Sequence, residues 1–325
     1  MLLKKTQMDN KNLENTRKAI HYYIDSRKED SIENSFLNFM LIDDMHLAIM
    51  PLNPRSNAKL RIEITPYSKD IEDLIMNGLI TQFGKAWDLK ESVCNFVNEL
   101  AHSLVYFGKV YYEIVYYFLD IKKIDYFEFQ RIPNDFIHSC LKFYWQFFPK
   151  NKQKKINKFN FLQKDRIMFI SIPKELGGYK RYRNTLRSLY SIRESFMPEF
   201  ALNDMMKQKS TKGYNYLMYY NCYEEEVAKI TRRFGWNARG TFQERSSEYY
   251  YFYRVLKFNK TKAILREHII KNLNKSLREI GKIMHFDANI LIKGLPTSKD
   301  YDRYLKELNK GTLQFKDIIY IEKNF

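Results

Sequence analysis

The sequence predicts an α+β fold in which helices accompany a small mixed or antiparallel sheet, with long helices in the C-terminal half. Three observations support this class. A capped helix after Asp88 ends at Gly108 and leads directly into a β-rich stretch. Strict alternation of apolar and polar residues over Lys59–Thr65 is typical of a half-buried strand. Apolar residues at three- and four-residue spacing over Lys262–Met284 indicate a long amphipathic helix.

The N-terminal part divides into two predicted regions. Residues 1–30 are interpreted as a charged N-terminal arm that carries a helix over Asn12–Asp25. Residues 31–148 are interpreted as an α/β region, which opens with an apolar helix over Ser31–Leu47. The alternating strand follows, and Ser68 then precedes another helical stretch.

The best-defined segment is a helix, a glycine and a hairpin. Asp88 and Glu91 form a capping-box pattern. Gly108 occupies the place of a C-cap glycine, so we expect it to adopt a left-handed backbone conformation. Lys109–Phe118 is rich in β-forming residues, and Ile121–Gln130 is its predicted hairpin partner.

The C-terminal part also divides into two predicted regions. Residues 149–165 are predicted to form a basic loop, and residues 166–325 a strand followed by a long-helix region. The strand is expected over Arg166–Ile172. A turn at Gly177–Gly178 follows, and Asn184 is expected to cap a helix that runs toward Lys209.

The segments after that helix are rich in aromatic residues. Tyr214–Tyr220 and Glu248–Leu256 are interpreted as strands, because Tyr, Phe and Val favour extended structure. Glu224–Phe234 between them is predicted to be a short helix, with its three glutamates at the start. Lys299–Asn309 is predicted to be the last short helix.

Composition limits the classes of protein that need consideration. The chain has 325 residues, 45% of them apolar, which is enough for a folded core. Its net charge of +17 attracts phosphate-rich or other acidic partners, although a composition rich in Lys, Asn and Ile could produce the same surplus. Three cysteines without CxxC spacing indicate free thiols in a reducing compartment. We expect no signal peptide and no contact with a membrane.

Motifs for catalysis, metals and cofactors are absent from the sequence. The six histidines form no metal-binding pair, and no glycine-rich phosphate loop occurs. Asp43–Asp44–x–His46 could hold a metal but is more typical of a solvated helix end. His138 and Cys140 share a face of a predicted strand, yet no third group to orient them is indicated. The sequence therefore favours a structural or nucleic-acid-associated protein without a cofactor, rather than an enzyme.

The strongest charge feature is the stretch Pro149–Arg187. It holds twelve basic and two acidic residues, with Tyr179, Tyr182 and Tyr190 among the arginines. Arginine with tyrosine suits contact with phosphates combined with stacking, although a merely solvated face would look the same. The residues predicted to contact nucleic acid are Lys150, Lys152, Lys154, Lys155, Lys158, Lys180, Arg181, Arg183 and Arg187.

The order of these elements resembles the portal proteins of tailed phages. The stretch Glu99–Val115, ELAHSLVYFGKVYYEIV, is similar to a portal segment in which a helix ends at a glycine and runs into an aromatic strand. Further similar segments are Ile132–Ile137 (IPNDFI), Ile167–Ile172 (IMFISI), Gly178–Leu189 (GYKRYRNTLRSL) and Leu308–Ile318 (LNKGTLQFKDI). The chain departs from the family in lacking the usual histidine after the strand and the Ser-Pro after the glycine.

The resemblance implies a portal-like fold and a structural function. A portal is a homo-oligomeric ring, or head–tail connector, through which double-stranded DNA is packaged and ejected. Its expected partners are copies of itself, the DNA, the packaging motor (terminase), the capsid and the neck proteins, in the virion and the host cytoplasm. The alternative is a sequence-nonspecific nucleic-acid-binding protein of a mobile element that uses residues 150–187.

Overall fold

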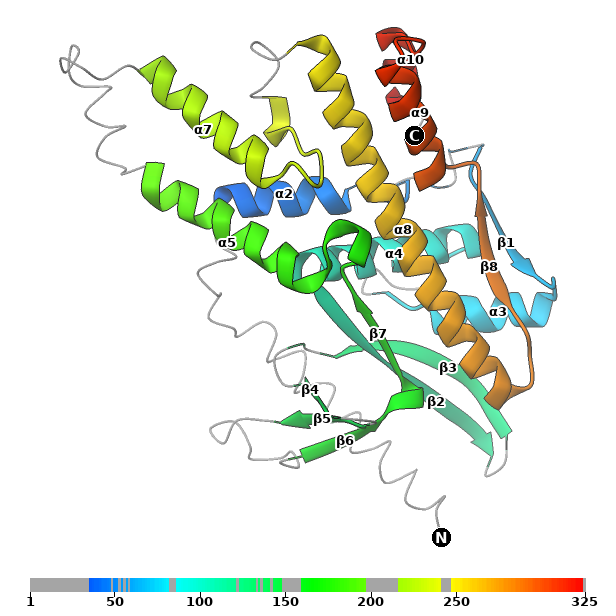
Figure 1. The fold of residues 1–325 in the computed structure, drawn as a ribbon. Helices are drawn as coiled ribbons and strands as arrows, with labels where there is room; N and C mark the ends of the chain where they lie inside the picture. The colour runs from blue at the N-terminus through cyan, green and yellow to red at the C-terminus, as the bar shows by residue number, and fades with distance from the viewer. Residues whose placement is uncertain are drawn as a thin grey trace. The chain divides into compact units, whose positions relative to one another are not determined.

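The fold is α+β, as predicted, with small antiparallel sheets and a long helix in the C-terminal half (Figure 1). The computed structural model describes residues 35–47, 49–51, 54, 57, 59–81, 86–120, 123–132, 134, 137–140, 143–147, 159–196, 216–240 and 247–323. The predicted N-terminal arm and the first part of the predicted basic loop, through Lys158, lie outside these residues. In the described ranges, no helix combines the length and apolar content needed to cross a membrane.

The elements follow one another without internal repetition. The α-helices are α2 (Phe36–His46), α3 (Lys69–Gly78), α4 (Leu89–Phe107), α5 (Gly178–Phe196), α7 (Tyr216–Ile230), α8 (Glu248–Met284), α9 (Ser298–Asn309) and α10 (Phe315–Lys323). The strands are β1 (Arg61–Thr65), β2 (Lys109–Asp120), β3 (Lys123–Ile132), β4 (Ile137–Cys140), β5 (Phe143–Phe147), β6 (Phe159–Gln163), β7 (Ile167–Ser171) and β8 (Asn289–Lys293). Short 3₁₀ helices are η3 (Lys164–Arg166), η4 (Lys174–Leu176) and η5 (Ala238–Gly240).

The described residues form two compact units. Unit 1 takes its residues from Asn53–Ser171 and Ile269–Lys293. Unit 2 takes its residues from Glu29–Leu52, Ile172–His268 and Gly294–Phe325. The long helix α8 therefore contributes its first part to unit 2 and its last part to unit 1.

Unit 1 is built on the sheet β3-β2-β7, in which both pairings of β2 are antiparallel (Figure 1). The hairpin of β2 and β3 is the one predicted from the sequence. Helix α4 packs on this sheet through Phe96, whose ring lies 5.5 Å from the rings of both Tyr112 and Phe129. The apolar face of α4 predicted from the sequence is buried. The three- and four-residue spacing of its apolar side chains therefore marks the face that packs into the core.

Helix α4 has its N-cap at Asp88 and its C-cap at Gly108, as the sequence predicts. The Asp88 side chain accepts a hydrogen bond of 2.7 Å from the Glu91 backbone N–H. The Glu91 carboxylate accepts a hydrogen bond of 2.9 Å from the backbone N–H of Trp87, the residue before Asp88. Gly108 ends the helix in the left-handed conformation, with φ of 74°. That confirms the conformation expected of this glycine.

Replacing Gly108 by valine is expected to destabilise unit 1. A β-branched residue at positive φ costs about 1 kcal/mol or more in backbone energy. The strand β2 begins at the very next residue, Lys109, so little chain is available to relax the strain. Chemical denaturation followed by circular dichroism measures the loss. Gly108→Asn is the matched variant, because asparagine tolerates this conformation. Equal stability of the valine variant and the parent would contradict the interpretation.

Two smaller antiparallel sheets complete unit 1. Strand β1, predicted from its alternation, pairs with β8, which the sequence reading did not find. Asn274 on α8 binds β8 at Ile290, where its side chain both donates to the carbonyl and accepts from the N–H. Strands β4, β5 and β6 form the third sheet.

Unit 2 is mostly helical. Helices α5 and α7 lie side by side, and α9 and α10 pack against the first part of α8 (Figure 1). That second contact buries Phe252, Val255, Leu256, Tyr301, Leu308 and Ile318 in one apolar cluster.

Four predictions in this region are wrong. Helix α5 begins at Gly178, so Asn184 lies within the helix instead of capping it. Tyr214–Tyr220 and Glu248–Leu256 are not strands, because α7 covers the described part of the first and α8 begins at Glu248. The three glutamates Glu224–Glu226 lie in the second half of α7, not at a helix start. Tertiary packing of the aromatic residues overrides their preference for strands.

Candidate nucleic-acid interface

The predicted basic residues divide between undescribed and described parts of the chain. Lys150, Lys152, Lys154, Lys155 and Lys158 lie outside the described residues. Lys180, Arg181, Arg183 and Arg187 lie on α5. Of these four, Arg183 is half-buried and the other three are exposed. Three of the four predicted contact residues on α5 are therefore accessible from solvent.

The helical spacing of α5 separates its basic and apolar residues. Lys180, Arg183 and Arg187 follow one another at intervals of three and four and so share one face. Tyr182, Leu186 and Leu189 occupy the opposite face and are fully buried. The Tyr182 ring meets Phe234 edge-on at 5.9 Å. The suggestion that Tyr182 stacks on a ligand is thus wrong, because it belongs to the core.

A groove opens beside the start of α5. We call it the basic groove. It has a volume of about 560 Å³. It receives side chains from the end of η4, from the end of α7 with the turn that follows, and from the middle of α8. Its lining residues are Glu175, Leu176, Lys229, Ile230, Arg232, Arg233, Lys257, Lys260, Thr261 and Ile264.

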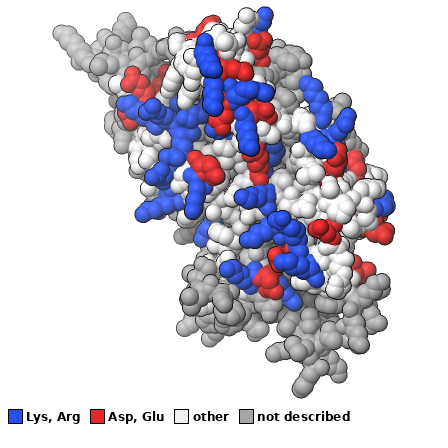
Figure 2. Space-filling view, turned by 45° about the vertical axis from the view of Figure 1, so that its right-hand side comes forward, with Lys and Arg blue, Asp and Glu red and all other residues white. Residues whose placement is uncertain are grey.

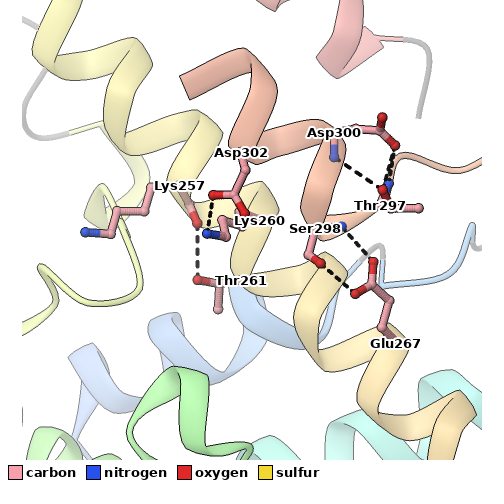
Figure 3. Close-up of polar contacts among 8 residues, drawn as sticks. All are labelled: Lys257, Lys260, Thr261, Glu267, Thr297, Ser298, Asp300 and Asp302. Atoms are coloured by element: carbon pink, nitrogen blue, oxygen red, sulfur yellow. Dashed lines mark hydrogen bonds and ion pairs between the residues drawn. The ribbon is translucent and has the colours of Figure 1, made fainter. Parts of the chain in front are cut away.

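Two of the five cations in the basic groove are neutralised by carboxylates. Lys229 pairs with Glu226 at 2.6 Å along α7. Lys260 pairs with Asp302 of α9 at 2.5 Å, and the Lys257 side chain extends away from this pair (Figure 3).

Among the residues that the structure describes, the other three cations lack such a carboxylate partner. Within the described residues, Arg232, Arg233 and Lys257 form no ion pair. Because Glu175 is the one carboxylate in the lining, the basic groove carries a surplus of positive charge.

The position of Lys257 shows the electrostatic consequence. Burial lowers the pKa of its ammonium group, and the neighbouring charges of Arg232, Arg254, Lys260 and Arg233 lower that pKa further. Its Nζ lies 5.6 Å from the centre of the Tyr253 ring, which favours the cation only weakly. An anion in the basic groove would remove this unfavourable crowding of like charges.

Arg181 connects the basic groove with the predicted basic face of α5. A Cβ atom at Gly177 would lie 3.0 Å from the Cβ of Arg181 and 3.4 Å from the Cδ of Arg233. The two arginines therefore flank the same glycine although they are far apart in sequence. Figure 2 shows one face of the molecule, on which Lys and Arg side chains gather in clusters with fewer Asp and Glu among them. The result is a basic surface that combines predicted and unpredicted residues.

Two further candidate residues from the sequence, Asp44 and His46, make contacts that hold the fold together. Asp44 accepts hydrogen bonds from the Trp236 indole at 2.7 Å and from Arg239 at 2.8 Å. The ring of His46 bonds to its own helix at the Ile42 carbonyl. These contacts fix the end of α2 and leave its carboxylates committed to neighbours. Throughout the part of the chain that the structure describes, no three metal-ligating side chains come together.

The two cysteines whose side chains are described differ in exposure, because Cys94 is buried and Cys222 is exposed. Cys94 and Cys222 are free thiols, as expected. Burial raises the pKa of the Cys94 thiol to about 12, so this residue stays protonated and unreactive. His138 and Cys140 do lie on one strand, β4, and their side chains fall outside the description.

The sequence analysis assigned no binding role to any of the five cations that line the basic groove. It treated Glu224–Phe234 only as a short helix and Glu248–Leu256 as a strand, so Arg232, Arg233 and Lys257 received no role. The adjacent arginines Arg232 and Arg233 before the turn glycine Gly235 were the only available signal. Comparison of the chain with models of protein families and with curated proteins finds no match.

Proposed function

We propose that this chain is the structural subunit of a portal-type ring through which DNA passes. The supporting observation is how the segments of the resemblance meet. Helix α4 ends at left-handed Gly108, and β2 begins at the next residue. The strand β7, from the similar IMFISI segment, pairs directly with β2. The segments that carry the resemblance are therefore neighbours, because β2 and β7 pair in one sheet and α4 leads directly into β2. The partners under this proposal are DNA, the packaging motor, the capsid and the neck proteins.

Exposed aromatic side chains also support association with further copies. Trp87 is 84% exposed, and Phe36 and Tyr67 are each 70% exposed. Large aromatic side chains are enriched where proteins associate, since they bury much area with few rotatable bonds. A ring needs two different patches on each subunit that repeat around an axis. Phe36 belongs to unit 2, whereas Tyr67 and Trp87 belong to unit 1, so each unit offers such side chains.

We expect the purified protein to form closed rings, or oligomers that grow with concentration. Light scattering after size exclusion gives the mass, and electron microscopy shows ring closure. Nuclease treatment beforehand ensures that bound nucleic acid does not hold subunits together. A strictly monomeric mass at high concentration and low salt would refute the proposal.

The second candidate is a sequence-nonspecific nucleic-acid-binding protein of a mobile element. The basic groove favours it, because unpaired arginines and a lysine suit phosphates and no base-reading module is recognisable. A monomer or dimer that binds unrelated sequences equally well would support this candidate over the ring. Rings that bind DNA would support the portal-type subunit.

A further inference from the structure

We propose that the basic groove is a binding site for the sugar–phosphate backbone of nucleic acid, with Arg232, Arg233 and Lys257 as its phosphate ligands. The inference rests on the proposed contact with DNA but not on ring formation. None of these three residues belongs to the basic segment that the sequence singled out.

The first argument is convergence. Arg232 and Arg233 come from the turn after α7, and Lys257 comes from the middle of α8. Among the described lining residues, five cations outnumber the carboxylate Glu175 around a hollow of about 560 Å³, and this surplus of positive charge attracts anions. Guanidinium groups can bind phosphate oxygens in pairs, and an ammonium group adds a compact point charge.

The second argument is the contrast with paired cations nearby. Lys229 and Lys260 line the same hollow and already have carboxylate partners at 2.6 and 2.5 Å. The chain therefore supplies partners for two cations and none, in its described residues, for the other three. Burial lowers the pKa of Lys257, and the like charges of Arg232, Arg254, Lys260 and Arg233 lower it further, so the crowded cations destabilise this region. Such a cost is typical of a site whose partner is a ligand.

The third argument concerns which polyanion fits. Arg181 lies beside Arg233 at the edge of the basic groove, and exposed Lys180 and Arg187 continue the positive charge along α5. A chain of regularly spaced phosphates can follow such a track, whereas one small anion would use the groove alone. A nucleic-acid backbone matches this extended arrangement through phosphate contacts, without reading bases.

The test compares two triple variants that lose the same charge. Arg232→Gln/Arg233→Gln/Lys257→Gln removes the proposed ligands. Lys299→Gln/Lys306→Gln/Lys310→Gln removes three exposed lysines of α9 and its C-terminal end, outside the groove. Fluorescence anisotropy measures binding of labelled duplexes of about 20 base pairs, in two unrelated sequences, across a range of salt concentrations.

We expect the groove variant to lose about tenfold or more in affinity at about 0.1 M salt. Its plot of log affinity against log salt should become shallower by about 2 to 3, since each phosphate contact contributes about 0.9 to the slope. The α9 variant should keep nearly the parental slope, and both duplex sequences should behave alike. Equal losses in the two variants would overturn the proposal, because the groove would then be no better than any basic surface.

Two further measurements separate other outcomes. A labelled polyglutamate peptide represents an acidic protein partner. If the groove variant loses binding to the peptide but not to the duplex, the occupant is an acidic protein and the proposal is wrong. In the parent protein, duplex should protect Lys257 from acylation, because bound phosphate groups would cover its ammonium group. Failure of duplex to protect Lys257 while it protects α9 lysines would overturn the proposal even if the variants misfold.

The oligomer measurement and this test can fail separately. A monomer that binds duplex through the basic groove would refute the ring and leave this inference intact. A ring-forming protein whose groove variant binds duplex as well as the parent does would refute this inference and leave the ring intact.

Discussion

Replacing Arg254 by methionine is expected to destabilise unit 2 by about 3–5 kcal/mol, the largest effect of any substitution considered. Arg254 is 2% exposed, and its guanidinium group holds the turn after α7 against α8. Burial lowers its pKa, while the hydrogen bond to the Tyr250 hydroxyl acts in the opposite direction. Its hydrogen bonds run to Asn237 Oδ1, the Ala228 carbonyl, the Tyr250 hydroxyl, Thr231 Oγ1 and the Trp236 carbonyl.

The expected loss comes from the partners that remain. Methionine fills much of the space, but the Ala228 carbonyl would lose the Arg254 donor inside the fold, and the Trp236 carbonyl would keep only the hydroxyl of Thr231. Each buried polar group left without a bond costs about 1–3 kcal/mol. Lysine should rescue only part of the stability, because it lacks the planar fork of arginine.

Urea denaturation followed by circular dichroism and tryptophan fluorescence measures the effect, since Trp236 is buried in unit 2. Arg278→Met is the matched control on the same helix, because Arg278 is exposed. A surface change of this kind is expected to stay within about 0.5 kcal/mol. Similar stability of the two variants would show that the Arg254 contacts contribute little.

Replacing Gly235 by alanine is expected to cost about 2–4 kcal/mol, through backbone strain and overlap together. Gly235 has φ of 79°. An added Cβ would lie 2.7 Å from both the Arg254 carbonyl oxygen and the Lys257 Cβ, and 2.8 Å from the Phe258 N atom. Backbone atoms of α8 cannot yield as a flexible side chain would, so the turn itself must move.

Gly311→Ala is the matched control, because comparison with it separates the cost of atomic overlap from the cost of backbone strain. Gly311 has φ of 71°, yet nothing lies within 4 Å of a Cβ built there. This variant should lose only the backbone term of about 1 kcal/mol. Thermal unfolding of both variants gives the difference. If the two lose the same stability, close approach of the turn to α8 is not what requires glycine at position 235.

Both substitutions also bear on the basic groove. The turn 231–236 carries Arg232 and Arg233 and is held on α8 by Arg254 and by the close fit of Gly235. Thr261 adds a bond from its hydroxyl to the Phe234 carbonyl. Displacing this turn should therefore weaken duplex binding in variants that still fold. The basic groove therefore depends on the contacts that hold this turn against α8.

Several features follow from the local sequence. Asp88 and the apolar periodicity after it start α4, and Gly108 ends it, because capping and left-handed glycine act within a few residues. The alternation around Ile62 identifies β1, and the residues after Gly108 identify β2 and its hairpin. Each of these elements is specified by residues within it or directly beside it, and contacts with distant parts of the chain do not change it.

Other elements depend on contacts from far along the chain. The aromatic stretch Glu248–Leu256 favours a strand by composition, yet Phe252, Val255 and Leu256 are buried together in the helix α8 against α9 and α10. Intrinsic preferences amount to about 1 kcal/mol per residue or less, so burial of such a cluster outweighs them. The start of α5 at Gly178 escaped prediction for a related reason, since burial of Tyr182 against Phe234 anchors its first turns.

The sequence by itself determined the fold class, the helix–glycine–hairpin segment and the basic character of α5. Only the tertiary structure decided which cations stand together. Lys229 pairs with Glu226 three residues earlier on α7, as local helical spacing allows, whereas only the packing of α9 against α8 brings Asp302 to Lys260. Arg181 and Arg233 meet at Gly177 because α5 and α7 pack side by side. A charge acts through distance in space, so its partners are fixed by the packing of elements and not by their order along the chain.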